Sequence, residues 1–500
     1  MNNLILGIIA LILASAGYWW SWRFQQRDHY GKAIGLMIVS ALCLYFYISA
    51  DFFLHHWDER YHALVAKNLL SHPLLPTLYN NPVLPYDFRD WQANHIWLHK
   101  QPLALWGIAG SMGLFGVNEL AVRLPSIVLV SIAVYLVFSV GSYLFNKNTG
   151  YLAAFFFSIN GLLLSLLGGR KATDHVDVFF MFFILLSVYL SIQYCKKEKL
   201  IYSVLVGITI GLAILSKWLP ALIVIPILLL LAWDSGKFSL RTIVVHFIVI
   251  LITLTVVFLP WQLYIFSAFP QEAAWESSYN LQHLSEGLEG HSRSIFFYLN
   301  RIRINYGEII YLPLGWFIWR SLKNPGDKKQ LAVLVWFLVP FVFFSVARTK
   351  MQAYLFITAP ALFFMTAEFF YALVRLKDQS RSKWIINLVL TLLVILPIRY
   401  GVERLTVFEF KERNPQWVID LRDLQKENFD NGVLFNYNRP IEAMFYTDLT
   451  VYPTIPSIDT ISALQEQGYT IIIRDDGNVP GHVREVENVV IKRLTQAVDD

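Results

Sequence analysis

The feature that most constrains the fold is a series of long apolar runs that recur through the first 400 residues. A helix that crosses the hydrocarbon core of a bilayer needs about 20 mainly apolar residues, and its backbone polar groups must be satisfied within the helix. The runs therefore predict about twelve transmembrane helices. They lie near residues 3–20, 33–50, 125–145, 150–167, 175–194, 200–216, 218–233, 242–262, 306–319, 330–346, 352–374 and 384–400.

The composition agrees with a chain that lies mostly in a bilayer. Hydrophobic residues make up 56% of the chain and charged residues only 15%, against about 25% charged residues in soluble proteins. The net charge of +5 is too small for so long a chain to indicate a nucleic-acid partner. Cys43 and Cys195 both belong to apolar runs, so no disulfide framework is expected.

Lysine and arginine in short loops predict the orientation, because such loops stay on the cytoplasmic side. The basic loops alternate and all fall on one side when residues 103–116 form an interfacial or re-entrant segment. The N-terminus, the loops 51–103 and 263–305 and the C-terminal segment then face outward. Ala14-Ser15-Ala16 resembles a signal-peptide cleavage site, but no basic residue precedes the apolar stretch, which favours a retained helix.

The chain divides into three parts. Residues 1–32 form an extra N-terminal helix and a cytoplasmic loop, and residues 33–400 form a helical membrane core. Residues 401–500 carry 10 Lys and Arg against 17 Asp and Glu, with strand-like runs at Val433, Val451 and Thr470 and a helix from Ile458 to Gln467. This pattern predicts a small α/β domain outside the membrane.

Acidic residues collect in the outward loops, where ionisable groups near a bilayer usually mark a functional site. Asp58 could take a proton from an acceptor as the acceptor attacks carbon, or Asp58 and Glu59 could cap the helix that begins near Arg60. Asp174 lies in a second outward turn, and Asp177, three residues on, shares its helix face. Capping is again the alternative to a role in catalysis.

Basic residues and histidines occupy the same outward loops. Lys100, Arg170, Arg348 and Lys350 could neutralise a phosphate, although each could instead snorkel toward lipid headgroups. His95 and His99 have the i, i+4 spacing of metal-binding histidines, and His283 and His291 lie in the loop 263–305. Solvated or hydrogen-bonded histidines are the alternative, since the sequence contains no complete ligand set.

Several short motifs resemble a known family. They are Asp58-Glu59-Arg60-Tyr61, Lys100-Gln101-Pro102-Leu103, Leu114-Phe115-Gly116, Arg123-Leu124-Pro125-Ser126, Arg170 to Asp174, Leu215-Ser216-Lys217, Gly290-His291 and Ser345 to Tyr354. In this order they resemble the membrane-embedded GT-C glycosyltransferases of the aminoarabinose-transferase and protein O-mannosyltransferase type. The resemblance covers roughly residues 33–400.

The resemblance implies a polyprenyl-phosphate sugar donor, transfer on the outer face and inversion at the anomeric carbon. It implies that Asp58, with Glu59 in the same motif, is the catalytic base or the acid that orients the acceptor, and that Asp174 is a second acid. It also implies a set of residues that bind substrate and its lipid phosphate: Lys100, Arg170, Arg348, Lys350, Tyr354, Tyr61 and Gln101. His99 and His283 stand where the aminoarabinose branch approaches a metal, so a divalent metal ion is a candidate cofactor.

The sequence thus predicts a glycosyltransferase of a bacterial inner membrane that acts on its periplasmic side. The acceptor could be a lipid such as lipid A, a protein or a glycan. No nucleotide cofactor is expected, because the chain has neither a phosphate-binding Gly-x-x-x-x-Gly-Lys loop nor a Rossmann fingerprint. A flippase or transporter of lipid-linked sugars is the alternative, favoured by Glu368 within an expected span, and a non-catalytic scaffold is a third reading.

Overall fold

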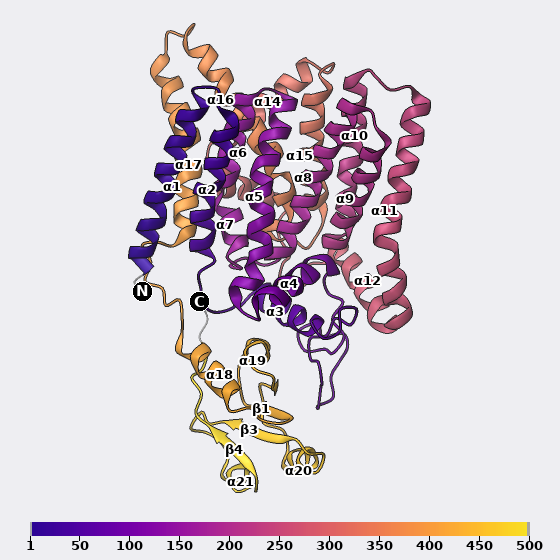
Figure 1. Cartoon of the computed structure of the whole chain (residues 1–500), viewed down its shortest axis with the longest axis vertical. Coiled ribbons are helices and arrows are strands. Elements are labelled where there is room, and N and C mark those ends of the chain that lie inside the picture. Colours follow the sequence, from indigo (N-terminus) through magenta and orange to yellow (C-terminus); the bar gives the residue numbers. More distant parts are fainter. Residues whose placement is uncertain (1–2, 498–500) are drawn as a thin grey trace.

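The computed structural model of the protein describes residues 3–497 and consists of a helical bundle with a small domain at one end (Figure 1). Within that range, nine helices are long and apolar enough to cross a membrane, and the bent pair α6–α7 makes ten. The nine are α1 (Asn3–Gln25), α2 (Tyr30–Ile48), α5 (Glu119–Leu144), α8 (Asp174–Lys197), α9 (Leu200–Lys217), α11 (Leu240–Ala268), α15 (Lys328–Val346), α17 (Lys383–Leu405), and η2 (Gln352–Thr358) continued by α16 (Ala359–Lys377).

The helical membrane fold is confirmed, but the expected count of twelve spans includes three segments that are not single long helices. Residues 150–167 form α6 (Lys147–Ser158) and α7 (Gly161–Leu167), which meet at 49°. Asn160 follows the first helix and caps the second, because its side chain accepts from the Leu163 amide at 3.1 Å. The other two segments form shorter helices, α10 (Val224–Ser235) after a 3-10 turn η1 (Leu219–Ile223), and α14 (Tyr311–Lys323).

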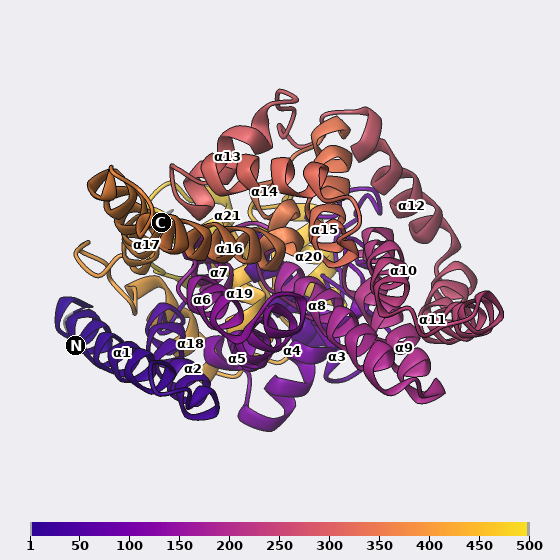
Figure 2. The same ribbon diagram turned by 90° about the horizontal axis from the view of Figure 1, so that it is seen from above.

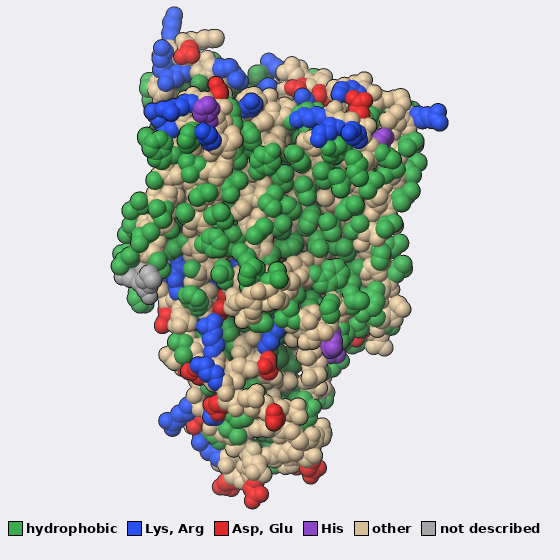
Figure 3. Space-filling model, in the orientation of Figure 1, with side chains coloured by type: hydrophobic (Ala, Val, Ile, Leu, Met, Phe, Trp, Pro, Cys, Tyr) green, Lys and Arg blue, Asp and Glu red, His purple; other side chains and the backbone are tan. Residues whose placement is uncertain are grey.

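The two ends of the bundle differ in charge. Lys and Arg side chains gather at the end away from the small domain, and a broad hydrophobic band separates them from the other end (Figure 3). We call the latter the domain end. Helices α3 (Asp58–Leu69), α4 (Pro102–Phe115), α12 (Pro270–Ser285) and α13 (Phe297–Tyr306) all belong to it. Viewed from above, α13 and α17 lie on one side of the bundle and α9 and α11 on the other (Figure 2).

The C-terminal residues form the predicted α/β domain. Its four strands are parallel in the order β2-β1-β3-β4, and Val433 pairs with Ile471 in the central register. The strands are β1 (Gly432–Phe435), β2 (Thr450–Val451), β3 (Thr470–Arg474) and β4 (Val489–Lys492), with helices α18 (Gln416–Lys426), α19 (Pro440–Tyr446), α20 (Ile458–Glu466) and α21 (Gly481–Arg484). Of these strands, β4 was not predicted from the sequence.

The C-terminal domain packs directly against the helical bundle. Leu434 and Ile472, which are neighbours on one face of the sheet, share a buried cluster with Leu64 of α3 and Ile108 of α4. On the other face, Val433 and its neighbours pack in a separate cluster with α20. The sheet therefore has one core of its own and one in common with α3 and α4.

Polar contacts fasten α19 to α3. Arg60 donates to both oxygens of the fully buried Glu442 at 3.2 and 3.3 Å. Lys67 donates to the carbonyls of Met444 at 2.9 Å and Thr447 at 2.7 Å, at the C-terminal end of α19. A cation at that end also meets the negative pole of the helix.

The buried hub at Arg123 holds the segment between α2 and α3. From the first turns of α5, this guanidinium donates to the carbonyls of Ser49, Asp51 and Phe53 at 3.0, 2.6 and 2.7 Å. It also grips Glu59 through two bonds of 2.7 and 2.9 Å. Both side chains of this pair are fully buried, so the pair fixes the chain that leads into α3.

Replacing Glu59 with Ala should lower the free energy of unfolding by about 3–5 kcal/mol, because the buried Arg123 would keep its charge without a carboxylate. The measurement is denaturation of the purified protein in detergent. Glu403→Ala, which removes one half of an exposed pair with Arg399, is the control and should change stability by less than about 1 kcal/mol. Similar losses in both variants would contradict the role of the hub.

Replacing Glu442 with Ala should loosen α19 from α3, because Arg60 and the neighbouring Arg439 would lose their shared carboxylate. We expect faster amide hydrogen exchange in α19 and in α3, with the membrane helices unchanged. Glu427→Ala is the control, since its pair with Lys492 is partly exposed and lies within the domain. Unchanged exchange in α3 would mean that the pair does not fasten the domain.

Candidate active site

Asp58 opens the candidate site at the domain end of the bundle. It is the first residue of α3, and its carboxylate accepts from the Thr173 amide at 3.1 Å. The ammonium group of Lys100 lies 3.5 Å from the same oxygen. Burial alone would raise the pKa of Asp58, but Lys100, His62 and His99 outweigh it and lower the pKa to about 2. Asp58 is therefore an ionised carboxylate beside a lysine.

Asp174 is the first residue of α8 and directly follows Thr173, whose amide donates to Asp58. Thr173 precedes it with a φ of 71°, a left-handed turn that directs the chain into the helix. One carboxylate oxygen of Asp174 contacts Nδ1 of His62 at 2.8 Å, and the other is buried without a hydrogen-bond partner among the described residues. The N-terminus of a helix favours this negative charge.

A second cation faces the site from α9. Lys217 pairs with Asp177, one turn into α8, and its ammonium group lies 4.3 Å from the ring centre of Tyr354. Asp177 also accepts from the hydroxyl of Thr173. Thr173 and Lys217 thus connect four of the predicted residues at the domain end: Asp58, Lys100, Asp174 and Tyr354.

Glu59 has different surroundings from Asp58, although both belong to one motif. Both oxygens of Glu59 are engaged by Arg123, and one of them also accepts from the His55 amide at 2.8 Å. Burial would raise the pKa of Glu59, but Arg123 and His175 outweigh it and hold the pKa below its usual range. Its carboxylate has no oxygen left for a substrate.

Arg170, predicted to bind substrate, is also engaged within the protein. It donates to Asp51 at 2.9 Å, to the Arg404 carbonyl at 3.2 Å and to the Thr406 hydroxyl at 3.0 Å. Asp51 in turn accepts from Lys411 at 2.8 Å. Arg170 therefore ties the turn after α7 to the end of α17.

The predicted cations Arg348 and Lys350 lie in a loop that pairs with the long loop 263–305. The amide of Arg348 donates to the Leu284 carbonyl and that of Lys350 to the His291 carbonyl, both at 3.1 Å. The ammonium group of Lys350 donates to the Arg293 carbonyl at 3.3 Å, whereas the side chain of Arg348 is exposed.

Tyr61 and Gln101, both predicted to bind substrate, lie in α3 and immediately before α4. Tyr61 packs against Trp91 with ring centres 5.0 Å apart. Gln101 precedes α4 and accepts from Gln262 of α11 at 3.0 Å. The hydroxyl of Tyr61 accepts from Arg60 at 3.2 Å.

The histidines do not meet in a metal site. His99 stacks on Trp91 at 4.3 Å and lies 3.5 Å from Glu276, whereas Nδ1 of His283 bonds to the Tyr279 carbonyl of its own helix. Among residues 3–497, no three His, Cys, Asp or Glu side chains gather as a metal-binding group. His99 and His283 therefore share no three-residue metal-binding group in the described part of the chain.

Several site residues were not selected from the sequence. His62 lies one turn after Asp58 on α3, and the i, i+4 spacing was its only signal. Lys217 belongs to the motif Leu215-Ser216-Lys217, whereas the only sequence signal for Asp177 was its position three residues after Asp174. Trp91, Tyr279 and Glu289, which meet through bonds of 2.8 and 2.7 Å beside His99, had no sequence pattern.

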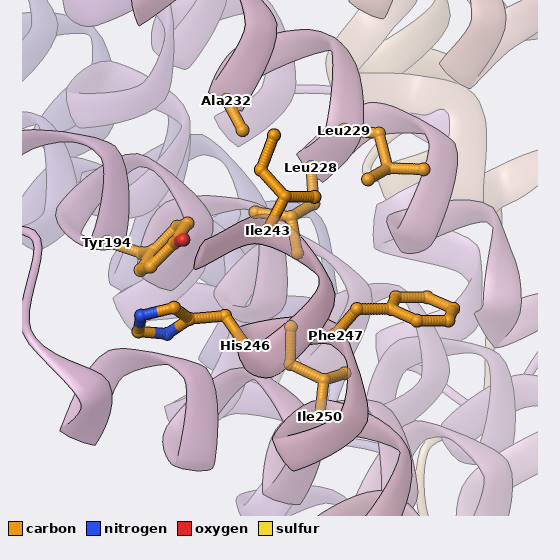
Figure 4. A pocket seen from close by; sticks show the side chains of 8 residues that line it. All are labelled: Tyr194, Leu228, Leu229, Ala232, Ile243, His246, Phe247 and Ile250. Atoms are coloured by element: carbon orange, nitrogen blue, oxygen red, sulfur yellow. The ribbon is translucent and has the colours of Figure 1, made fainter. Parts of the chain in front are cut away.

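A further pocket lies elsewhere, among α8, α10 and α11 (Figure 4). It is lined by Tyr194, Leu228, Leu229, Ala232, Ile243, His246, Phe247 and Ile250. Its lining is apolar apart from Tyr194 and His246, and His246 bonds to Ser203 at 2.7 Å. It contains no acid, unlike the cluster around Asp58.

Three comparisons bear on this arrangement. The sequence model of the dolichyl-phosphate-mannose-protein mannosyltransferase family matches residues 99–262. An uncharacterised protein of Aquifex aeolicus is 26% identical over 70% of this chain and 65% of its own length. The undecaprenyl phosphate-alpha-4-amino-4-deoxy-L-arabinose arabinosyl transferase of Pseudomonas aeruginosa is 25% identical over 64% of this chain and 59% of its own length. The matches thus span about three fifths of these relatives.

Solved structures share the fold. ArnT from Cupriavidus metallidurans, bound to undecaprenyl phosphate, superposes with a TM-score of 0.61 at 14% identity over 86% of this chain and 88% of that one. The oligosaccharyltransferase AglB from Archaeoglobus fulgidus superposes with a TM-score of 0.56 at 13% identity over 83% of this chain and 64% of that one. The predicted resemblance is confirmed: this multi-pass membrane protein has the fold of the GT-C glycosyltransferases and is similar in sequence to those of the ArnT type.

Proposed function

We propose that the protein transfers a sugar from a polyprenyl-phosphate donor to a lipid, protein or glycan acceptor, with inversion at the anomeric carbon. The observation that carries the proposal is the ionised Asp58 held 3.5 Å from Lys100, with Asp174 and Lys217 beside it. An acid for the acceptor and cations for a leaving phosphate then face one another. The relatives of the ArnT type, one of which was solved with undecaprenyl phosphate, support this donor class.

The reaction requires one bond to form and one to break. The acceptor oxygen or nitrogen attacks the anomeric carbon, and the bond between that carbon and the phosphate oxygen breaks with its electron pair on the phosphate. Asp58 orients the acceptor and receives its proton, which requires hydrogen-bond reach. Lys100 and Lys217 stabilise the charge that develops on the phosphate, and Tyr354, under the Lys217 ammonium, holds that cation in place.

Lys100 links donor binding to the basicity of Asp58. A carboxylate with a pKa of about 2 is a weak proton acceptor near neutral pH. A donor phosphate would attract Lys100 and so remove part of the charge that keeps this pKa low, which makes Asp58 more basic when the donor is present. The buried oxygen of Asp174 that lacks a partner is available to a hydroxyl of the sugar or the acceptor.

The charge distribution supports an orientation. Because basic loops stay in the cytoplasm, we place the basic end of the bundle there and the domain end with the candidate site on the periplasmic side of a bacterial inner membrane. A polyprenyl-phosphate donor reaches this side through the bilayer, so the reaction needs no nucleotide.

The transporter alternative depended on Glu368, an acid within a membrane helix. Glu368 accepts from Arg320 at 2.8 Å and from the hydroxyl of Thr149 at 2.7 Å. A buried acid with both oxygens satisfied by neighbouring helices serves packing between α14, α16 and α6. It therefore gives no support to a transport pathway.

Replacing Asp58 with Asn should reduce sugar transfer by about 100-fold or more, because general acid–base groups contribute about 10²–10⁴. Asp174→Asn should also lower kcat. The assay supplies polyprenyl-phosphate sugars and candidate acceptors to purified protein and measures released polyprenyl phosphate. Asp423→Asn in α18, which alters an exposed carboxylate, is the control. Turnover of Asp58→Asn at the rate of the unchanged protein would overturn the assignment.

Replacing Lys100 with Met should raise the pKa of Asp58, because Lys100 is the largest of the influences that lower it. Activity that needs the carboxylate is present above this pKa and is lost as the pH falls through it. The residual kcat/KM of Lys100→Met should therefore decline at a higher pH than that of the unchanged protein. A Lys100→Arg variant, which keeps the charge, should retain the original profile. Identical acid limits in all three proteins would contradict the coupling.

A further inference from the structure

Three cations lie on neighbouring segments at the domain end of the bundle, where Tyr400 of α17 donates to Asn305 of α13 at 3.4 Å. Lys171 lies in the turn after α7, Arg404 in the last turn of α17, and Arg301 on α13. Arg170 fixes this arrangement, because it donates to the Arg404 carbonyl at 3.2 Å and to the Thr406 hydroxyl at 3.0 Å. The turn that carries Lys171 is thereby tied to the end of α17. We call Lys171, Arg301 and Arg404 the basic cluster.

The basic cluster has no acid of its own. None of its three members forms an ion pair with a carboxylate in the described part of the chain. Burial lowers the pKa of Lys171, and the charges of Arg404 and Arg301 lower it further. Nε of Arg404 is buried and has no hydrogen-bond partner among residues 3–497.

Aromatic rings hold the two arginines without neutralising them. The guanidinium of Arg404 lies 4.8 Å from the ring centre of Tyr400, and that of Arg301 lies 5.3 Å from that of Phe297. Such contacts orient a cation and leave its charge in place. Arg399 of the same helix differs, since it pairs with Glu308 at 3.2 Å and with Glu403 at 2.8 Å.

Three partly buried like charges repel one another, and an unpaired buried charge is costly. A bound anion would remove both costs, and an arginine fork fits the oxygens of a phosphate in particular. The cluster lies where α7 and α17 end, at the domain end of the bundle, where the broad hydrophobic band stops (Figures 1 and 3). Its ligand is then a phosphate carried by a lipid.

We propose that Lys171, Arg301 and Arg404 bind the phosphate group of a lipid in the outer leaflet. This site is separate from Lys217, because α17 and α13 lie across the bundle from α9 (Figure 2). It is nevertheless close to the candidate active site along the chain, since the carbonyl of Lys171 accepts from the Asp174 amide at 3.1 Å. The phosphate belongs either to a lipid acceptor or to a membrane phospholipid.

The test measures binding of dioleoylphosphatidic acid to the full-length protein in detergent by native mass spectrometry. Dioleoylglycerol, which has the same chains and no phosphate, is the matched ligand. Arg301→Gln and Arg404→Gln should each weaken binding of the phosphatidic acid by about tenfold, the effect of one charge-assisted hydrogen bond. Arg404→Lys should retain much of the binding, and Arg399→Gln should retain all of it.

The outcomes separate the site from the proposed function and the two sources of phosphate from each other. Equal binding of dioleoylglycerol, undiminished binding in Arg301→Gln and Arg404→Gln, or equal weakening in Arg399→Gln would overturn the proposal. Asp58→Asn should bind the phosphatidic acid normally, so failure of the transfer assay leaves this test intact. If Arg301→Gln and Arg404→Gln weaken binding and also raise the KM for a phosphorylated lipid acceptor at similar kcat, the bound phosphate is that of the acceptor. This source of the phosphate depends on the proposed function. If these variants bind less phosphatidic acid but transfer sugar as before, the bound phosphate is that of a membrane phospholipid.

Discussion

The buried pair of Arg123 and Glu59 determines how the rest of the domain end is arranged. Burial of two charges is costly, and it is tolerated here because Arg123 also satisfies three backbone carbonyls of the segment before α3. Successive residues on a helix differ in direction by about 100°. With Glu59 turned inward to Arg123, Asp58 must therefore turn toward Thr173 and Lys100. A structural ion pair thus sets the direction of the candidate catalytic acid.

Helix α3 carries this orientation to the C-terminal domain. Its first residues face the candidate site, whereas Arg60 and Lys67 hold α19 through Glu442 and three backbone carbonyls. A displacement of the domain would therefore move the helix that begins at Asp58. The domain lies beside the site and shares its support, so its position is part of the geometry of the site.

The sequence predicted the fold well wherever one physical requirement dominates. Long apolar runs must be helices in lipid, and most of those runs form long spans. Helices α10 and α14, with 12 and 13 residues, are shorter than the roughly 20 residues that cross a bilayer. The site was predicted less completely. A motif pointed to Asp58 and Glu59 together, and only the contact with Arg123, 64 residues further on, distinguishes their roles. Arg170 was likewise assigned to a ligand because its partner Asp51 lies 119 residues away.

Pairing, rather than the number of charges, decides which cations at the domain end can act on a ligand. Arg123 pairs with Glu59 and Arg170 pairs with Asp51, so the charge of each holds the fold together. Lys100 is paired less tightly than these arginines, since its contact with Asp58 is long enough, at 3.5 Å, to be exchanged for a phosphate. Among residues 3–497, no carboxylate forms an ion pair with the basic cluster around Arg404. An excess of basic residues on an outward face therefore says little until each partner is known, and the unpaired ones are where an anionic lipid has most to contribute.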